Sequence, residues 1–245
     1  MKKSLDTYFY SENIKNNLIR FTPDEINHII NVWRVENGDE IFVTDGKGKL
    51  FTAIVKVFKR NELVAEIIKE EDVDNSPGCA ITLCIGLTSS GRLESAVDIC
   101  TQLGVEKLCF FQADRVNEKW SDKRIDTLLN RSRRIAISAI KQCKTTILPD
   151  IQFIGGLDYI LRIFKDYDHL FYADFDGIPG FYGMDINPRG SYMLIVGPPG
   201  DFSSRERELM DELKIIPVTL GNRRLRTESA SIVIVSKLLT TLKYI

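Results

Sequence analysis

The chain has 245 residues, and its 33 lysines and arginines almost balance its 34 aspartates and glutamates, which gives a formal net charge of -1. This balance excludes a general electrostatic attraction to nucleic acid, so any RNA binding must come from local basic patches. The apolar fraction of 44% is ordinary for a folded globular protein and excludes intrinsic disorder.

The first residues carry no targeting pattern. A basic start is followed by an apolar stretch too short for a signal-peptide core, and nowhere do about eighteen apolar residues run together. We therefore expect no membrane association and a cytoplasmic location. The five cysteines include no C-x-x-C pair and the chain has only two histidines, so we expect reduced, structural cysteines and no metal site.

Residues 6–68 predict a small strand-rich module. Stretches rich in β-branched and aromatic residues predict strands at 41–46, 50–58 and 63–68. The segment DGKGK between the first two predicts a hairpin turn. A helix is predicted within residues 22–35, because Thr22 can cap it and Pro23 suits its first position.

A turn-rich segment around residues 70–78 predicts a domain boundary, which we place between residues 1–72 and 73–245. After this segment, apolar strands alternate with amphipathic helices that begin near Arg92, Asp122, Ser203 and Glu228. This alternation predicts an α/β domain with a largely parallel sheet, in which ligands bind beyond the carboxyl ends of the strands. The predicted strands lie within 81–87, 107–111, 169–175, 191–197 and 215–221.

The first chemical motif is the Gly-Pro-Pro-Gly turn at residues 197–200, which follows an apolar strand and precedes a helix that Ser203 or Ser204 can cap. Gly197 and Gly200 carry no side chain, so a flat adenine or a ribose could lie against the backbone, and the prolines fix the shape of the loop. A tight turn with no ligand is the alternative interpretation.

The second motif is a loop after the next predicted strand, which holds Arg223, Arg224 and Arg226 before a helix that Thr227 can cap. Guanidinium groups offer fork-like donors and a flat stacking face, so this loop suits a phosphate or an electron-rich base. A solvated loop neutralised by nearby acids is the alternative.

Together the two motifs resemble the cofactor loops of the SPOUT methyltransferases, in particular the 16S rRNA (uracil-N3)-methyltransferase family. That family's pattern is close to GPEGGFS-x-x-E followed by LG-x-R-x-LRTETA, which corresponds here to residues 197–206 and 220–230. The segments SGRLESAVDICTQLGVEKL and RSRRIAISAIKQCKTTILPDI are also similar to the family. The segment HIINVWRVENGDEIFVTDGKG resembles its PUA-like RNA-binding domain, so the resemblance spans nearly the whole chain.

The chain departs from the family pattern at several positions. Pro199 replaces the Glu of GPEGG and Asp201 replaces its last Gly. Lys141 and Thr145 stand where a helix motif has Glu and Arg, and Ser229 replaces a Thr. The glycines of both loops are kept, so we still expect the loops to bind a cofactor.

The resemblance implies an α/β fold with a C-terminal SPOUT-type parallel sheet, threaded through a trefoil knot, and a small N-terminal PUA-like β-barrel domain. It implies S-adenosylmethionine as the cofactor, held bent among loops near residues 173–177, 195–200 and 220–226. The cofactor-binding residues it implies are Ile195, Val196, Gly197, Pro198, Gly200, Leu220, Gly221, Leu225, Arg226 and Thr227.

The implied activity is methylation of uracil N3 in 16S ribosomal RNA of the small subunit, by a homodimer. Arg226 is the first catalytic candidate, because a fixed positive charge near the uracil carbonyls would stabilise the negative charge that develops as N3 loses its proton. An ion pair with Glu228, the second catalytic candidate, or a contact to the cofactor carboxylate is the alternative for Arg226. Candidates to contact RNA phosphates are Arg34, Arg92, Arg115, Lys119, Arg131 and Arg134.

Two other functions compete with this interpretation. The segment GLTSSGRL keeps the glycine spacing of a phosphate loop, but Arg92 and Leu93 replace the lysine and the magnesium-binding hydroxyl, which disfavours nucleotide hydrolysis. The other alternative is a catalytically weakened or inactive RNA-binding or ribosome-assembly protein on the same fold.

Overall fold

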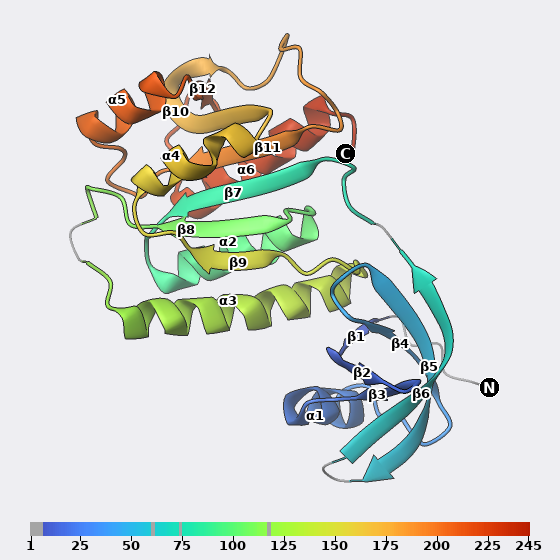
Figure 1. Cartoon of the computed structure of the whole chain (residues 1–245). Helices are drawn as coiled ribbons and strands as arrows, with labels where there is room; N and C mark the ends of the chain where they lie inside the picture. The colour runs from blue at the N-terminus through green and yellow to red at the C-terminus, as the bar shows by residue number, and fades with distance from the viewer. Residues whose placement is uncertain (1–6, 60–61, 74, 117–118) are drawn as a thin grey trace. The chain divides into compact units, whose positions relative to one another are not determined.

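The computed structural model describes residues 7–59, 62–73, 75–116 and 119–245, and Figure 1 shows its helices and strands. The chain forms two compact units. The first combines Met1–Asn75 with Ile137–Leu148, and the second combines Ser76–Ala136 with Pro149–Ile245. Residues 137–148, which lie beyond the domain boundary expected near residue 72, group with the first unit.

The first unit is a curled six-stranded sheet with one helix, in the strand order β1-β4-β5-β6-β3-β2. The β1–β4 pair is parallel and the other pairs are antiparallel. The three predicted strands are confirmed as β4, β5 and β6. The elements are β1 (Phe9–Tyr10), β2 (Asn13–Lys15), β3 (Leu18–Arg20), α1 (Pro23–Asn31), β4 (Glu40–Thr44), β5 (Lys49–Lys59) and β6 (Glu62–Asp72).

Helix α1 begins as predicted and ends earlier. The Thr22 hydroxyl accepts a hydrogen bond from the Glu25 amide at 3.4 Å, and Pro23 occupies the first turn. Ile26 and Ile29 are buried in the core of the first unit. The helix ends at Asn31 because the chain then turns, and Arg34 takes a left-handed backbone conformation with φ of 51°.

Residues 137–148 contribute a nearly buried ion pair to the first unit. Lys141 Nζ lies 2.7 Å from Glu25 Oε2, and only 11% and 10% of the two side chains are exposed. The other Glu25 oxygen accepts a hydrogen bond from the Tyr10 amide at 3.1 Å. Lys141 therefore supplies the cation that a buried carboxylate requires.

The second unit is built on a six-stranded parallel sheet in the order β12-β10-β11-β7-β8-β9, which confirms the predicted α/β class. Every strand that the sequence predicted here is present, and β9 is an additional short edge strand. The strands are β7 (Ala80–Gly86), β8 (Lys107–Phe111), β9 (Asp150–Phe153), β10 (His169–Pro179), β11 (Ser191–Val196) and β12 (Ile216–Thr219).

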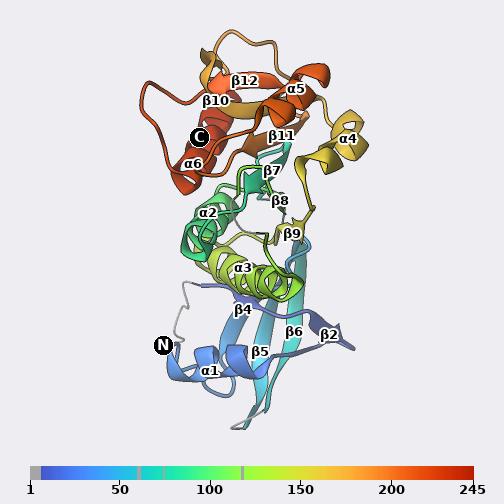
Figure 2. The same ribbon diagram turned by 90° about the vertical axis from the view of Figure 1, so that its left-hand side faces the viewer.

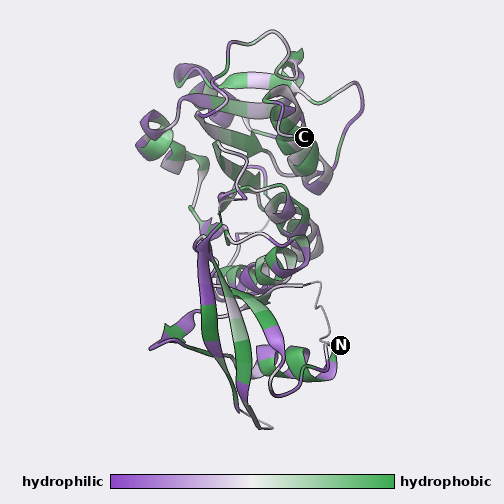
Figure 3. Ribbon diagram, turned by 90° about the vertical axis from the view of Figure 1, so that its right-hand side faces the viewer, coloured by the Kyte–Doolittle hydropathy of each residue, from purple (hydrophilic) through white to green (hydrophobic). Residues whose placement is uncertain are grey.

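Helices cover both faces of the parallel sheet. Figure 2 shows α2 and α6 on one face and α4 and α5 on the other. The core strands of this sheet are buried along almost their whole length, whereas Figure 3 shows that the long strands of the first unit change between hydrophilic and hydrophobic residues. The helices are α2 (Ser90–Gln102), α3 (Asp122–Cys143), η1 (Leu157–Tyr159), α4 (Ile160–Ile163), η2 (Phe164–Asp166), α5 (Ser204–Glu212) and α6 (Thr227–Thr241). None of these helices, as far as they are described, is both long and apolar enough to cross a bilayer.

The cysteines are mostly buried. Cys79, Cys84, Cys100 and Cys109 are buried, Cys143 is partly exposed, and none forms a disulfide. Burial raises the pKa of Cys79 to about 11 and that of Cys100 to about 12, so these thiols stay protonated at pH 8.

We expect an aromatic disulfide reagent at pH 8 to modify Cys143 first and the other cysteines only after denaturation, because the exposed thiolate is the reactive form. The absorbance of the released thiolate measures the rate and the number of thiols. Rapid modification of several thiols in the folded chain would contradict this expectation.

Candidate functional site

A cavity of about 340 Å³ lies where β11 and β12 end and where β10 is irregular. Its wall is formed by residues 173–175 of β10, by the end of β11 with the loop that follows, and by residues 219–221 and 223–227 at and after the end of β12, with Arg92 from α2 and Ala230 from α6. These are the three segments expected to bind a cofactor. Parallel strands bring them together, because the carboxyl ends of such strands meet at one edge of the sheet.

The loop after β11 packs tightly against its surroundings. A Cβ atom on Gly197 would lie 3.0 Å from the ring of Phe202, which is itself buried. A Cβ atom on Gly86, at the end of β7, would lie 2.6 Å from the Pro198 nitrogen. The glycines therefore permit close backbone packing that fixes the position of the loop.

Thr227 has a different role from the predicted helix cap. The N-cap residue of α6 is Arg226, and Thr227 is the first helical residue. The Thr227 side chain is buried, and its hydroxyl donates a hydrogen bond to the Gly197 carbonyl at 3.2 Å. The prediction of a Thr227 cap was wrong, because this hydroxyl joins α6 to the loop after β11 instead.

The two catalytic candidates lie in different surroundings. Arg226 is exposed, lines the cavity and makes no ion pair with any described residue. Glu228 is outside the cavity wall, and its carboxylate lies 3.8 Å from Arg92 Nε. Glu228 therefore pairs with Arg92 and not with Arg226, which leaves the Arg226 guanidinium available to a ligand.

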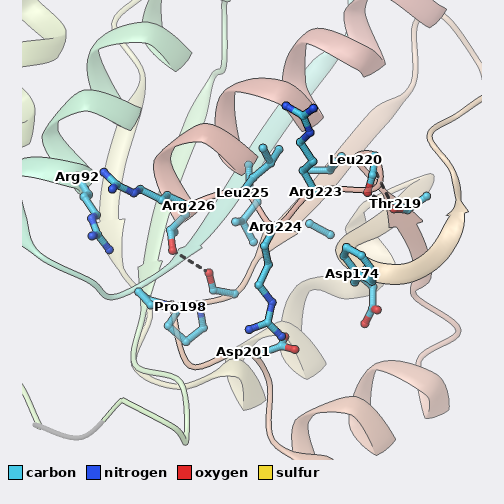
Figure 4. A pocket seen from close by; sticks show the side chains of 18 residues that line it. Arg92, Asp174, Pro198, Asp201, Thr219, Leu220, Arg223, Arg224, Leu225 and Arg226 are labelled. Atoms are coloured by element: carbon cyan, nitrogen blue, oxygen red, sulfur yellow. Dashed lines mark hydrogen bonds between the residues drawn. The ribbon is translucent and has the colours of Figure 1, made fainter.

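The cavity wall is rich in charge. Arg92, Arg223, Arg224 and Arg226 all line it, together with Asp174 and Asp201. Figure 4 shows Arg92 and Arg226 at one end and the two aspartates at the other, with Arg224 pointing toward Asp201. Val196, Leu220 and Leu225 add apolar surface. Among the residues that the structure describes, no group of three His, Cys, Asp or Glu side chains could hold a metal ion.

Most of the expected cofactor-binding residues line this cavity, but two lie elsewhere. Ile195 is fully buried on β11 in the core of the second unit. Gly200 lies against Arg115, whose carbonyl oxygen would be 3.1 Å from a Cβ atom there. The expected residues found in the wall are Val196, Gly197, Pro198, Leu220, Gly221, Leu225, Arg226 and Thr227.

The candidates for RNA contact are distributed over the chain. Arg34 is exposed in the first unit, whereas Arg92 lines the cavity. Arg131 is exposed on α3 and pairs with Glu94 at 3.0 Å. Arg115, Lys119 and Arg134 are exposed in the second unit. Arg92 lies in the first turn of α2, directly after β7. This position in the sequence could have indicated that Arg92 lies at the edge of the sheet where ligands bind.

The family assignment follows from comparison with known proteins. A family model described as an RNA methyltransferase domain matches residues 74–239, and one described as an RNA methyltransferase PUA domain matches residues 21–68. The parallel sheet with its loop-lined cavity is thus the fold of a SPOUT-type methyltransferase. The chain belongs to this RNA methyltransferase family.

Several proteins that it resembles are named ribosomal RNA small subunit methyltransferase E. The one from Aquifex aeolicus is 29% identical over 233 residues, which cover 94% of this chain and 98% of the relative. The one from Bacillus subtilis is 27% identical over 216 residues, which cover 85% and 84% of the two chains.

A solved structure gives the same assignment. The ribosomal RNA small subunit methyltransferase E from Neisseria gonorrhoeae, bound to S-adenosyl methionine, is 26% identical, with a TM-score of 0.83 over 96% of this chain and 97% of that chain. The prediction of an α/β methyltransferase domain with an N-terminal PUA-like domain is confirmed. The trefoil knot stays a prediction.

Proposed function

We propose that this chain transfers a methyl group from S-adenosylmethionine to N3 of a uracil in 16S ribosomal RNA of the small subunit. The observation that carries the proposal is the single cavity lined by all three expected cofactor segments. The relatives that cover most of this chain carry the matching name, and the gonococcal structure contains the cofactor.

The cavity fits such a cofactor in size and chemistry. Its volume of about 340 Å³ is within the range of small-molecule sites. The backbone at Gly197 and Gly221 offers a surface for a flat adenine, and Leu220 and Leu225 offer apolar contacts. The arginines and aspartates of the wall suit a ligand that carries both carboxylate and cationic groups. We propose that the cofactor is bound by Val196, Gly197, Pro198, Leu220, Gly221, Leu225, Arg226 and Thr227. Ile195 and Gly200 do not line the cavity and would act through the packing of the loop after β11.

The chain's contribution to the reaction is orientation and charge. The cofactor, when bound, supplies a sulfonium methyl group that is open to in-line attack. The protein must hold uracil N3 in line with that methyl group and favour loss of the N3 proton. Arg226 has an available guanidinium at the cavity and would stabilise the negative charge that spreads onto the uracil carbonyls. Arg92, oriented by Glu228, adds a second positive charge.

For the RNA, we propose that residues 1–72 form an RNA-binding domain and residues 73–245 the methyltransferase domain. Arg34 in the first, and Arg115, Lys119, Arg131 and Arg134 in the second, would contact phosphates, which give affinity and register. The proposal includes a homodimer that acts on the small subunit in the cytoplasm.

Two measurements test the proposed function. Calorimetry with the purified chain should show micromolar binding of S-adenosylmethionine and no binding of ATP. Mass spectrometry of 16S ribosomal RNA should show one methylated uridine that disappears in cells lacking the protein. If the chain binds the cofactor but the methylation of 16S ribosomal RNA is the same in cells with and without the protein, the inactive RNA-binding alternative is favoured. If the chain does not bind the cofactor, the proposal is refuted.

The close packing of the loop after β11 gives a further expectation. In Gly86→Ala the new methyl group would meet the Pro198 nitrogen at 2.6 Å and displace the loop. Overpacking of this kind costs about 1–3 kcal/mol, so we expect the Kd for S-adenosylmethionine to rise about tenfold or more. Gly91→Ala is the matched control, because a Cβ atom there meets nothing within 4 Å. Equal Kd values for the two variants would contradict the expectation.

A further inference from the structure

Arg207 of α5 joins two carboxylates that stand on different segments of the cavity wall. Its guanidinium contacts Asp174 of β10 and, at 2.8 Å, Asp201 of the loop after β11. Asp174 is nearly buried, with 7% of its side chain exposed, whereas Asp201 is 46% exposed. Both aspartates line the cavity (Figure 4), whereas Arg207 is not one of the residues that line it.

Asp201 is held in a backbone conformation that favours glycine. Its φ is 62°, and the family pattern has glycine at this position. The Asp201 amide donates to the Pro198 carbonyl at 2.9 Å, and Asp201 Oδ1 accepts from the Phe202 amide at 2.8 Å. Asp201 therefore retains the turn that glycine would make and adds a carboxylate. The carboxylate that the family pattern carries at position 199 is thus present two residues later.

The base from which Arg207 extends is rigid. Ser203 caps α5, and Glu206 completes a capping box in which its carboxylate accepts from the Ser203 amide at 2.8 Å. Glu206 is fully buried and also accepts from the Asp114 amide at 3.0 Å. The first turn of α5 is therefore fixed, and a side chain on it can fix whatever it binds.

We propose that Arg207 is a positioning residue, which holds the β10 segment at Asp174 and the loop at Asp201 at the spacing that cofactor binding requires. This proposal rests on the proposed function. Two carboxylates from separate segments bound to one planar guanidinium form a geometrically specific link. In this link both acids of the wall are paired with Arg207, at the end of the cavity away from Arg92 and Arg226.

When Arg207 is replaced, the change in geometry and the change in charge have opposite expected effects on the affinity for S-adenosylmethionine. Removing a positive charge makes this end of the cavity more negative, which on its own would tighten the binding of a cationic sulfonium. S-adenosylhomocysteine has the same shape as S-adenosylmethionine without the sulfonium charge. Loosening the two segments would weaken the binding of both ligands to the same extent. A comparison of the two ligands therefore separates the two effects.

The test uses the full chain and calorimetry with both ligands. Arg207→Met should raise both Kd values about tenfold, as expected for the loss of charge-assisted bonds to two groups. Arg207→Lys should recover part of the affinity, and Asp201→Asn should show a smaller loss. At saturating cofactor, kcat should stay within about twofold of wild type, since Arg207 does not line the cavity.

Arg205→Met is the matched control. Arg205 lies on the same turn of α5 and pairs at 2.8 Å with Asp114 and Asp158, neither of which lines the cavity. Hydrogen bonds from Arg205 and then Ser203 lower the pKa of Asp114, so this ion pair is also well formed. Arg205→Met should leave both Kd values unchanged.

The proposal is overturned if Arg207→Met binds both ligands as wild type does, if it binds only S-adenosylmethionine differently, or if Arg205→Met shows the same loss. Thermal unfolding of each variant identifies a folding defect, and Asp201→Asn then tests the link without changing α5. A wild-type chain that binds neither ligand would refute the proposed function, and the role of Arg207 in cofactor binding with it.

Discussion

Arg226→Ala is expected to lower kcat for ribosomal RNA methylation by about 10²–10³-fold, the usual effect of removing one group that stabilises developing charge. The Arg226 side chain lines the cavity, is exposed and makes no ion pair within the described residues. Its removal should therefore affect the reaction far more than the stability of the fold. Arg226→Lys keeps the charge without the planar fork and should retain part of the activity.

The measurement is single-turnover methylation of small-subunit RNA, together with the Kd for S-adenosylmethionine and the Tm of each variant. Arg224→Ala provides the comparison within the same loop, because it stands at a variable position of the family pattern and points toward Asp201 (Figure 4). We expect a smaller loss for Arg224→Ala than for Arg226→Ala. Turnover near the wild-type rate in Arg226→Ala would remove this residue from the catalytic role.

Glu206→Ala is expected to destabilise the second unit by about 3 kcal/mol, because two partly buried hydrogen bonds from backbone amides would lose their acceptor. One Glu206 oxygen accepts from the Asp114 amide and the other from the Ser203 amide, and the side chain has no exposed surface. For a unit of this size, the Tm should fall by about 6–12 °C.

Differential scanning calorimetry can measure this change. Glu208→Ala is the control, since Glu208 lies on the same helix and is exposed. Its Tm should stay close to that of wild type. A similar Tm for both variants would show that the buried capping box contributes little to stability.

The sequence predicted the elements whose local pattern is sufficient to specify them. Thr22 and Pro23 specified the start of α1, and the apolar strands of the second unit were long enough to be recognised without knowledge of their neighbours. Two glycine- or arginine-rich loops at strand ends also predicted the cavity, because a parallel sheet brings such ends together.

Features that depend on tertiary contacts could not be predicted in this way. The edge strand β9 (Asp150–Phe153) is short and only half-buried, so it carries no periodic signal. From the sequence, Thr227 was expected to cap α6, and only the packed structure shows that its hydroxyl bonds to Gly197. Arg207 was one charge among several on an amphipathic helix, since its two partners lie 33 and 6 residues away.

Helix α3 has an additional consequence for protein synthesis. Its last residues, 137–143, belong to the first unit, and among the ion pairs of the described residues Lys141 there is the only partner of the buried Glu25 carboxylate. A nascent chain that has emerged only as far as residue 75 therefore lacks this counterion. The N-terminal unit can reach its final state only after residues 137–148 have left the ribosome, and by then residues 76–136 of the second unit have emerged as well, so the two units do not fold in strict succession.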